Sequence, residues 1–373
     1  MRDLLMGFVG DVHVSRDNPQ EVFSEVLEVL NVPGVLFGNL EGAYTNDPTL
    51  ASNALIASAN NLDTYAAAGF HVMSLANNHM ADAGYEAMLQ TRSRLRSLGV
   101  KTCGAGACLA DAREPAVVEV HGLRIAFLGY ASTFPVGWQA ESNKPGLAPM
   151  RATNSLCCPG YFCQCRAPGA LWHEQFADYY QPGTRPLVAT VPDQIDVANL
   201  TEDIQRARQC ADLVVTSFHW GDPTRRFHLT DHEIRTAKHC IDHGANMVVG
   251  HHHHSLRGME WYKGKPIMYG LGHFAFDHRS AQVEDARVTL MAWTTAGRDG
   301  IRDIGFLPCR LVPDGSVHPL RLNSLESNEV VSYLEKCNGS QGLNSCIVSH
   351  GAISIAGFPT LRVTSAYRHS PGP

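Results

Sequence analysis

Five short polar motifs in this 373-residue chain carry side chains that bind metal ions or transfer protons. Each follows a short apolar run of the kind that predicts a β-strand. Loops at the carboxyl ends of strands assemble the ligand sites of α/β sheets, so we expect the motifs to meet at one place. The motifs are Gly10-Asp11-Val12-His13, Gly38-Asn39-Leu40-Glu41, Ala76-Asn77-Asn78-His79, Ser217-Phe218-His219-Trp220-Gly221 and Gly250-His251-His252-His253-His254.

Each motif alone also has a plain structural interpretation. In a continuing strand Asp11 and His13 point the same way and grip one ion, although an isolated Asp-x-His more often caps a helix or pairs at the surface. A single His219 is more often a hydrogen-bonded core or loop histidine. Together, the five motifs would place costly polar groups side by side without partners. Metal ions are the natural partners for such a set.

The elements expected to position these motifs alternate between strands and helices, which indicates α/β layering. Two strand candidates close together late in the chain indicate an α/β sandwich with two sheets. The strand candidates are Leu4 to Val9, Val35 to Phe37, Val72 to Leu75, Arg124 to Leu128, Leu213 to Ser217, Asn246 to Val249, Pro266 to Tyr269 and Val288 to Thr294. The helix candidates are Pro19 to Leu30, Leu62 to Ala68, Tyr85 to Leu98, Val197 to Cys210, Asp231 to His243 and Asn328 to Lys336.

The order of these motifs resembles the calcineurin-like metallophosphoesterase superfamily. More closely, the chain resembles the poly-γ-glutamate capsule branch called CapA, over about residues 5 to 280. The resemblance is carried by Gly10-Asp11-Val12, Asn39-Leu40-Glu41, Leu75-Ala76-Asn77-Asn78-His79, His219-Trp220-Gly221, Gly250-His251-His252-His253-His254, Gly258-Met259-Glu260 and Gly270-Leu271-Gly272-His273-Phe274-Ala275-Phe276-Asp277.

The resemblance implies a four-layer α/β/β/α sandwich with two mixed sheets and a site for two divalent metal ions. Glu41 would bridge the ions, and His79 would protonate the leaving group. The family usually has Pro at the position of His253 and Asn at that of His273, so two extra imidazoles are expected at the rim of the site. The resemblance implies one ion on Asp11, His13 and His254, and the other on Asn78, His219 and His252.

A shell of Asp, Glu, Asn and His without thiolate suits Mn, Fe, Zn or Co. Two such ions about 3.5 to 4 Å apart orient a bridging hydroxide and polarise a phosphoryl or carbonyl oxygen. The leading prediction is therefore a dinuclear metal-dependent hydrolase that cleaves an amide or phosphoester bond in a small-molecule or peptide-like substrate. The alternatives are a protein of poly-γ-glutamate (capsule) biosynthesis or modification, and a non-catalytic binding module that keeps the fold.

The amino-acid composition limits the classes of binding partner and the cellular compartment that we expect for this protein. A formal charge of −6 without a Lys/Arg run gives no footprint for a nucleic acid or an anionic membrane surface. No apolar run approaches the roughly 20 residues of a spanning helix, which predicts a soluble protein without a membrane partner. Eleven cysteines at irregular spacing favour free thiols in the cytoplasm. The oligomeric state stays open.

The predicted organisation is a metallohydrolase domain over residues 1–323, with an insertion or lid at about 135–195, followed by a C-terminal helix and tail over 324–373. Four cysteines crowd into the insertion, as free thiols or, alternatively, as a structural zinc site. Asp82 is expected to cap the following helix, the alternative being a hydrogen bond to His79. The crowded cysteines are Cys157, Cys158, Cys163 and Cys165.

Overall fold

The structure is a computed structural model that describes residues 3–47, 55–157, 187–278, 284–349 and 353–366. Its strands form two large mixed sheets. The larger has the order β21 (Cys346–Val348), β24 (Leu361–Thr364), β19 (Gly300–Leu311), β18 (Val288–Gly297), β1 (Leu4–His13), β2 (Val35–Leu40), β5 (Val72–Ser74) and β6 (Lys101–Cys103), with β17 (His273–Phe276) beside β1 and β20 (Val317–Pro319) beside β19. The smaller has the order β15 (Met259–Tyr262), β16 (Lys265–Met268), β14 (Met247–His251), β13 (Leu213–His219), β9 (Leu123–Ala131) and β8 (Ala116–Val120).

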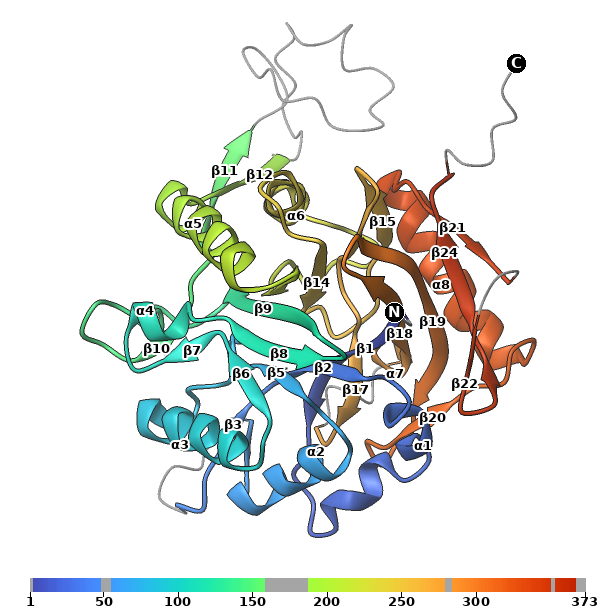
Figure 1. Ribbon diagram of the computed structural model, residues 1–373, viewed down its shortest axis with the longest axis horizontal. Helices are drawn as coiled ribbons and strands as arrows, with labels where there is room; N and C mark the ends of the chain where they lie inside the picture. The colour runs from blue at the N-terminus through green and yellow to red at the C-terminus, as the bar shows by residue number, and fades with distance from the viewer. Residues whose placement is uncertain (1–2, 48–54, 158–186, 279–283, 350–352, 367–373) are drawn as a thin grey trace, which may run out of the picture.

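Helices cover the outer faces of both sheets, and one apolar core fills the space between them. In that inner core Phe37 of the larger sheet stacks on Phe127 of the smaller, with ring centroids 5.2 Å apart. Figure 1 shows α5 (Gln194–Cys210) and α6 (Asp231–Asp242) on the opposite side of the molecule from the helices of the N-terminal part. Those helices are η1 (Pro19–Phe23), α1 (Leu27–Leu30), η3 (Ala59–Leu62), α2 (Asp63–Ala67) and α3 (Gly84–Ser97).

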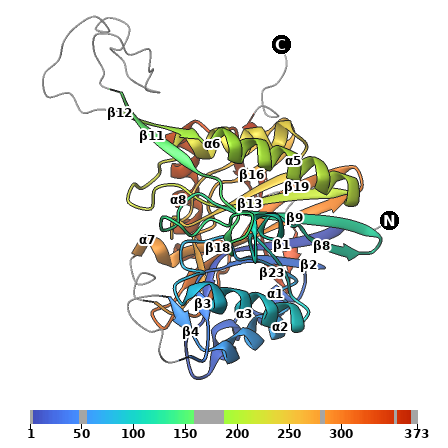
Figure 2. The same cartoon turned by 90° about the vertical axis from the view of Figure 1, so that its left-hand side faces the viewer.

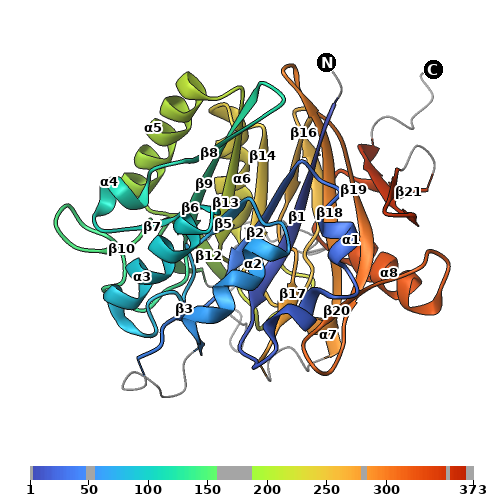
Figure 3. The ribbon, with the colours of Figure 1, turned by 60° about the horizontal axis from the view of Figure 1, so that its bottom comes forward.

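The two outer cores complete the layering. Val22 and Met88 pack in one cluster with residues of the larger sheet. Leu200 and Ala237 pack in another with residues of the smaller sheet. Figure 3 shows the two sheets partly edge-on, with α5 outside one and α1 outside the other. The four-layer α/β/β/α sandwich with mixed sheets is therefore confirmed.

Each predicted strand is present, and four of them, β1, β2, β13 and β14, extend further into the functional motifs than predicted. The helix predicted over Pro19 to Leu30 is split into η1 and α1, which are 5 and 4 residues long. The remaining short elements are β3 (Ala43–Tyr44) with β4 (Ile56–Ala57), β7 (Ala105–Gly106) with β10 (Gly146–Leu147), β22 (Ser354–Ile355) with β23 (Phe358–Pro359), α4 (Leu109–Ala112) and α7 (Glu284–Arg287).

The segment after residue 323 packs closely on the rest of the chain. α8 (Leu325–Gln341) contains the predicted helix and contributes Val330 and Leu334 to the core between the sheets. The following strands β21 and β24, which the sequence patterns did not indicate, extend the larger sheet. The division into residues 1–323 and 324–373 stays a prediction.

The middle of the predicted insertion, residues 158–186, lies outside the described residues. Its two flanks pair as an antiparallel hairpin of β11 (Ala152–Cys157) and β12 (Leu187–Pro192). Figure 2 shows this hairpin reaching out from the end of the molecule beside α6. Of the four crowded cysteines, Cys158, Cys163 and Cys165 fall outside the described residues, so the lid and the zinc alternative stay predictions.

None of the helices in the described part of the chain combines the length and the apolar character that crossing a bilayer requires.

Candidate metal centre

The five motifs converge because the strands that precede them run parallel within their sheets. In the larger sheet Asp11 of β1 is the register partner of Asn39 in β2, and Asn39 is the partner of Ser74 in β5. In the smaller sheet His219 of β13 is the partner of His251 in β14. A 3.2 Å hydrogen bond from the His252 backbone amide to the side-chain oxygen Oδ2 of Asp11 joins the two sheets at this edge.

The first ligand group consists of Asp11, Glu41, His254 and His273, one donor atom of each lying within 4.8 Å of the others. His13 lies beside it, with Nδ1 2.9 Å from the backbone oxygen of Glu41. That contact fixes the ring with Nδ1 protonated and leaves Nε2 free as a ligand, a common arrangement around metal-binding histidines.

The second ligand group consists of Asn78, His219 and His252. His219 Nε2 lies 2.6 Å from Asn78 Oδ1 and 3.1 Å from His252 Nδ1. On its other edge, His219 Nδ1 lies 3.3 Å from Asn39 Nδ2. The three predicted ligands of the second ion are thus brought into direct contact.

Glu41 lies between the two groups. The Oε1 atom of Glu41 makes no hydrogen bond. It lies 3.9 Å from His219 Nε2 in the second group and 3.9 Å from His79 Nε2. Both carboxylate oxygens are buried without a hydrogen-bond partner. Burial, with the negative charges of Asp11 and Asp82, raises the pKa of Glu41 well above its usual value. An anion in this position calls for a cation beside it.

The other donor atoms also fit metal ions. Burial lowers the pKa of His252 to about 3, and lowers those of His13 and His254 to about 4, so these rings are neutral at pH 7 and offer a lone pair. Burial alone would raise the pKa of Asp11, but its neighbours, His251 first, lower it below the usual range. The residues therefore offer neutral imidazoles and carboxylates to a divalent ion.

The histidine run is held in an unusual backbone conformation. His252 and His254 have φ angles of 91° and 58°, the left-handed region that costs non-glycine residues energy. His253, between them, turns away and places Nε2 2.9 Å from Glu233 Oε1 of α6. The expectation of two extra imidazoles at the rim is wrong, because His253 and His273 are 2% and 0% exposed.

His79 stands at the edge of the cluster, with 30% of its side chain exposed. Its Nδ1 lies 2.8 Å from Asp82 Oδ2, and the same carboxylate oxygen accepts the Leu55 amide. α3 begins after Ala83, with no side-chain cap. The expected capping role of Asp82 is therefore wrong, and the alternative, a hydrogen bond to His79, is what the structure contains.

Three residues that the sequence patterns did not single out as ligands also line the cluster. Asn39 donates a 2.8 Å hydrogen bond to Asp11 Oδ1, and His251 Nδ1 lies 3.5 Å from the same oxygen. His273 enters the first ligand group itself. Strand register places it there, because β17 pairs in parallel with β1 and His273 is the partner of Asp11, a pairing that the sequence patterns do not specify.

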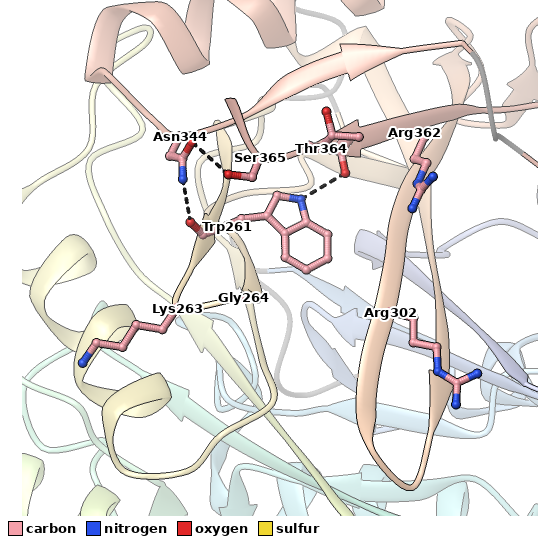
Figure 4. A pocket seen from close by; sticks show the side chains of 9 residues that line it. Trp261, Lys263, Gly264, Arg302, Asn344, Arg362, Thr364 and Ser365 are labelled. Atoms are coloured by element: carbon pink, nitrogen blue, oxygen red, sulfur yellow. Dashed lines mark hydrogen bonds between the residues drawn. The ribbon is translucent and has the colours of Figure 1, made fainter. Parts of the chain in front are cut away.

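A separate hollow of about 180 Å³ lies elsewhere, between the β15–β16 turn, the β18–β19 hairpin and β24. Figure 4 shows Trp261 in its centre, with its indole nitrogen bonded to the Val363 oxygen, and the two arginines across from it. None of the predicted site residues lines it. Its cations already have acidic partners: Lys263 pairs with Asp242, Arg302 with Asp3 and Asp299, and Arg362 with Asp303.

Comparison with known proteins identifies the family. Residues 5–278 match the model of the family described as bacterial capsule synthesis protein PGA_cap. The chain therefore belongs to this family, which confirms the CapA resemblance.

Two individual relatives share 30% of their aligned residues or fewer with this chain. The protein y4sH of Sinorhizobium fredii is 30% identical over 72% of this chain, which spans 65% of that relative's length. The capsule biosynthesis protein CapA of Bacillus anthracis is 26% identical to this chain. The alignment covers 90% of this chain and 71% of the length of that relative. The calcineurin-like phosphoesterase YfkN of Bacillus subtilis superposes with a TM-score of 0.36 at 8% identity, covering 91% of this chain and all of its own.

Proposed function

We propose that this protein is a dinuclear metal-dependent hydrolase that cleaves an amide or phosphoester bond in a small or peptide-like substrate. The observation that carries the proposal is the Glu41 carboxylate, buried without a hydrogen-bond partner between two sets of ligand atoms. An unpartnered buried carboxylate costs several kcal/mol unless a cation compensates it. A bridging role between two ions accounts for that cost.

We assign Asp11, His13 and His254 to one ion and Asn78, His219 and His252 to the other, with Glu41 shared. Divalent ions held there would act as Lewis acids and lower the pKa of bound water. The chain itself supplies the orientation. Strand-end backbone and the hydrogen bonds to His13 and Asp11 fix the donor atoms before any ion binds.

His79 is the residue that we expect to deliver a proton to the leaving group. An ionised carboxylate only accepts hydrogen bonds, so Asp82 holds the hydrogen on His79 Nδ1. The other nitrogen, Nε2, faces Glu41 and the cluster and is the one that exchanges a proton.

Family membership favours a peptide-like substrate. The relative in Bacillus anthracis is named a capsule biosynthesis protein, and one in Mycobacterium tuberculosis is named for polyglutamine synthesis. A role in the biosynthesis or modification of poly-γ-glutamate is accordingly the second candidate, with the same site acting on the polymer. A non-catalytic binding module is the third.

Two measurements test the proposal on the full chain. Metal analysis after supplementation with Mn, Fe, Zn or Co is expected to give about two ions per chain. A panel of p-nitrophenyl phosphates and γ-glutamyl amides is then expected to reveal turnover of one class. Fewer than one ion per chain would overturn the proposal, and two ions with no turnover of either class would favour the binding module.

The variant His79→Ala isolates the proton-transfer role. We expect it to keep both ions but to lower kcat by about 100- to 10,000-fold, the range of general acid catalysis. His243→Ala, at the end of α6 away from Glu233, is the matched control and is expected to keep wild-type turnover. Wild-type turnover in His79→Ala would remove this residue from the mechanism.

We also propose a cytoplasmic location, supported by the free thiols. The seven cysteines whose side chains the structure describes are free thiols, and four of them are buried: Cys103, Cys240, Cys309 and Cys337. Thiols of this kind persist in a reducing compartment.

A further inference from the structure

His273 reaches the first ligand group because two glycines let β17 approach β1 closely. A Cβ atom on Gly10 would lie 1.9 Å from the backbone oxygen of Gly272, a distance that no side chain tolerates. The Asp11 amide instead donates a 2.9 Å hydrogen bond to that oxygen. The next residue, His273, is then the parallel register partner of Asp11, so both side chains leave the sheet at the same point.

The ring of His273 is held firmly but is chemically unsatisfied. One face stacks on Phe276, with ring centroids 3.9 Å apart and planes 19° apart. Its centroid lies 4.3 Å from that of His254. The residue is 0% exposed, and neither ring nitrogen has a hydrogen-bond partner. Each buried nitrogen without a partner lowers the stability of the fold by about 1–3 kcal/mol, and packing alone does not explain why it is kept there.

We propose that His273 is an additional protein ligand of the ion assigned to Asp11, His13 and His254, with Glu41 shared, and that this imidazole tunes the site toward Zn²⁺, Co²⁺ or Fe²⁺. One donor atom from each of these four residues lies within a single 4.8 Å cluster. The inference deepens the proposed function, since it depends on a metal centre at this place. Nitrogen-rich sites favour these ions over Mn²⁺ and Mg²⁺, which prefer oxygen ligands.

The competing role is a hydrogen bond without coordination. A neutral imidazole has one N–H, which could point at the unpartnered Glu41 oxygens while the other nitrogen stays empty. That arrangement orients Glu41 but adds no nitrogen to the metal. Counting the metal-bound imidazoles separates the two roles, and that count does not depend on catalysis.

The test uses the full chain loaded with Co²⁺ and observed by proton NMR. A paramagnetic ion shifts the exchangeable ring N–H of each coordinating histidine outside the normal spectrum. We expect five such signals from wild type and four from both His273→Asn and His273→Gln. The expected five arise from His13, His219, His252, His254 and His273. The buried control His253→Asn, whose wild-type ring bonds Glu233 instead of the cluster, is expected to keep five.

Chelator competition gives a second, independent measure. We expect His273→Asn to lower the affinity of one ion for Zn²⁺ by roughly 100-fold and for Mn²⁺ by less than roughly tenfold, because the new amide oxygen still serves the harder ion. Four signals in wild type, or equal losses for both metals, would overturn the inference while leaving the metal centre intact. Absence of any bound ion in wild type would instead overturn the proposed function.

Discussion

Both ligand groups contain two histidines, but they differ in their oxygen donors and in how their donor atoms are satisfied. In the second group, His219 Nε2 lies within hydrogen-bond distance of Asn78 and His252. In the first group, Glu41 and His273 have no hydrogen-bond partner. Without an ion, the donor atoms of the second group can hydrogen-bond to one another, whereas Glu41 and His273 of the first group have no such partner. We therefore expect the first group to bind its ion more tightly, because an empty first group leaves more buried atoms unpaired.

The largest expected effect comes from Glu41→Gln, which removes the charge that the two groups share. Losing several kcal/mol of transition-state stabilisation lowers kcat by about 1,000-fold or more. Metal analysis should show weaker binding at both sites. If the variant keeps two tightly bound ions and the wild-type rate, Glu41 does not link the groups.

The difference between the groups is measured directly by His254→Ala and His252→Ala. Each variant should lose one ion, with an affinity loss on the order of 100-fold. His254→Ala should remove the ion that wild type gives up last to a chelator, and His252→Ala the one it gives up first. The reverse order would show that hydrogen bonding within the second group does not weaken its ion.

Acid should destabilise the metal-free protein. His252, with a folded pKa of about 3, and His13 and His254, with folded values of about 4, all lie below the usual 6.5. The unfolded chain therefore binds more protons once the pH falls below about 6.5, and stability is lost progressively toward pH 4. The raised pKa of Glu41 acts in the opposite direction, but one carboxyl is outnumbered by the imidazoles.

Chemical denaturation of chelated protein at pH 7 and pH 5 measures this loss. We expect about 2 kcal/mol from each of the three imidazoles and about 3 kcal/mol in total once the opposing Glu41 carboxyl is subtracted. Metal-loaded protein is the control and should change less, because bound ions hold the rings neutral until they are displaced. Equal stability of chelated protein at the two pH values would contradict the burial of neutral histidines.

The smallest expected effect is that of Asp82→Asn, which leaves both ligand groups intact. The variant keeps an amide oxygen as acceptor for the Leu55 amide but replaces the carboxylate that orients the His79 ring by a neutral group. We expect kcat to fall by about tenfold, with metal content unchanged. A loss of metal would show that Asp82 orients the ligand groups instead of the proton donor His79.

Much of the fold was predictable because the signals are local. Apolar runs such as Leu213 to Ser217, each ending in polar residues, mark buried strands with functional loops. The split of Pro19 to Leu30 into two short helices was not predictable, since its apolar spacing suits one continuous helix. Strands β21 and β24 were missed because they are only 3 and 4 residues long and are defined by pairing with each other and with β19 at the sheet edge.

The role of Asp82 was misassigned for a similar reason. Asp before a helical run usually caps that helix, and the sequence contains nothing to oppose this. The backbone between His79 and Ala83 turns so that the carboxylate meets the imidazole three residues earlier. A hydrogen bond across a turn depends on that local path, which residue spacing alone does not specify.

The sequence by itself determined which residue types are available and that parallel strand ends bring them together, because strand periodicity and polar strand ends are properties of neighbouring residues. The tertiary structure alone decided which of the adjacent imidazoles faces the ligand groups. His253 turns to Glu233 on a helix from another part of the chain, while His273 turns inward beside Asp11. Identical side chains acquire different chemistry here because their partners come from distant segments whose packing no local pattern encodes.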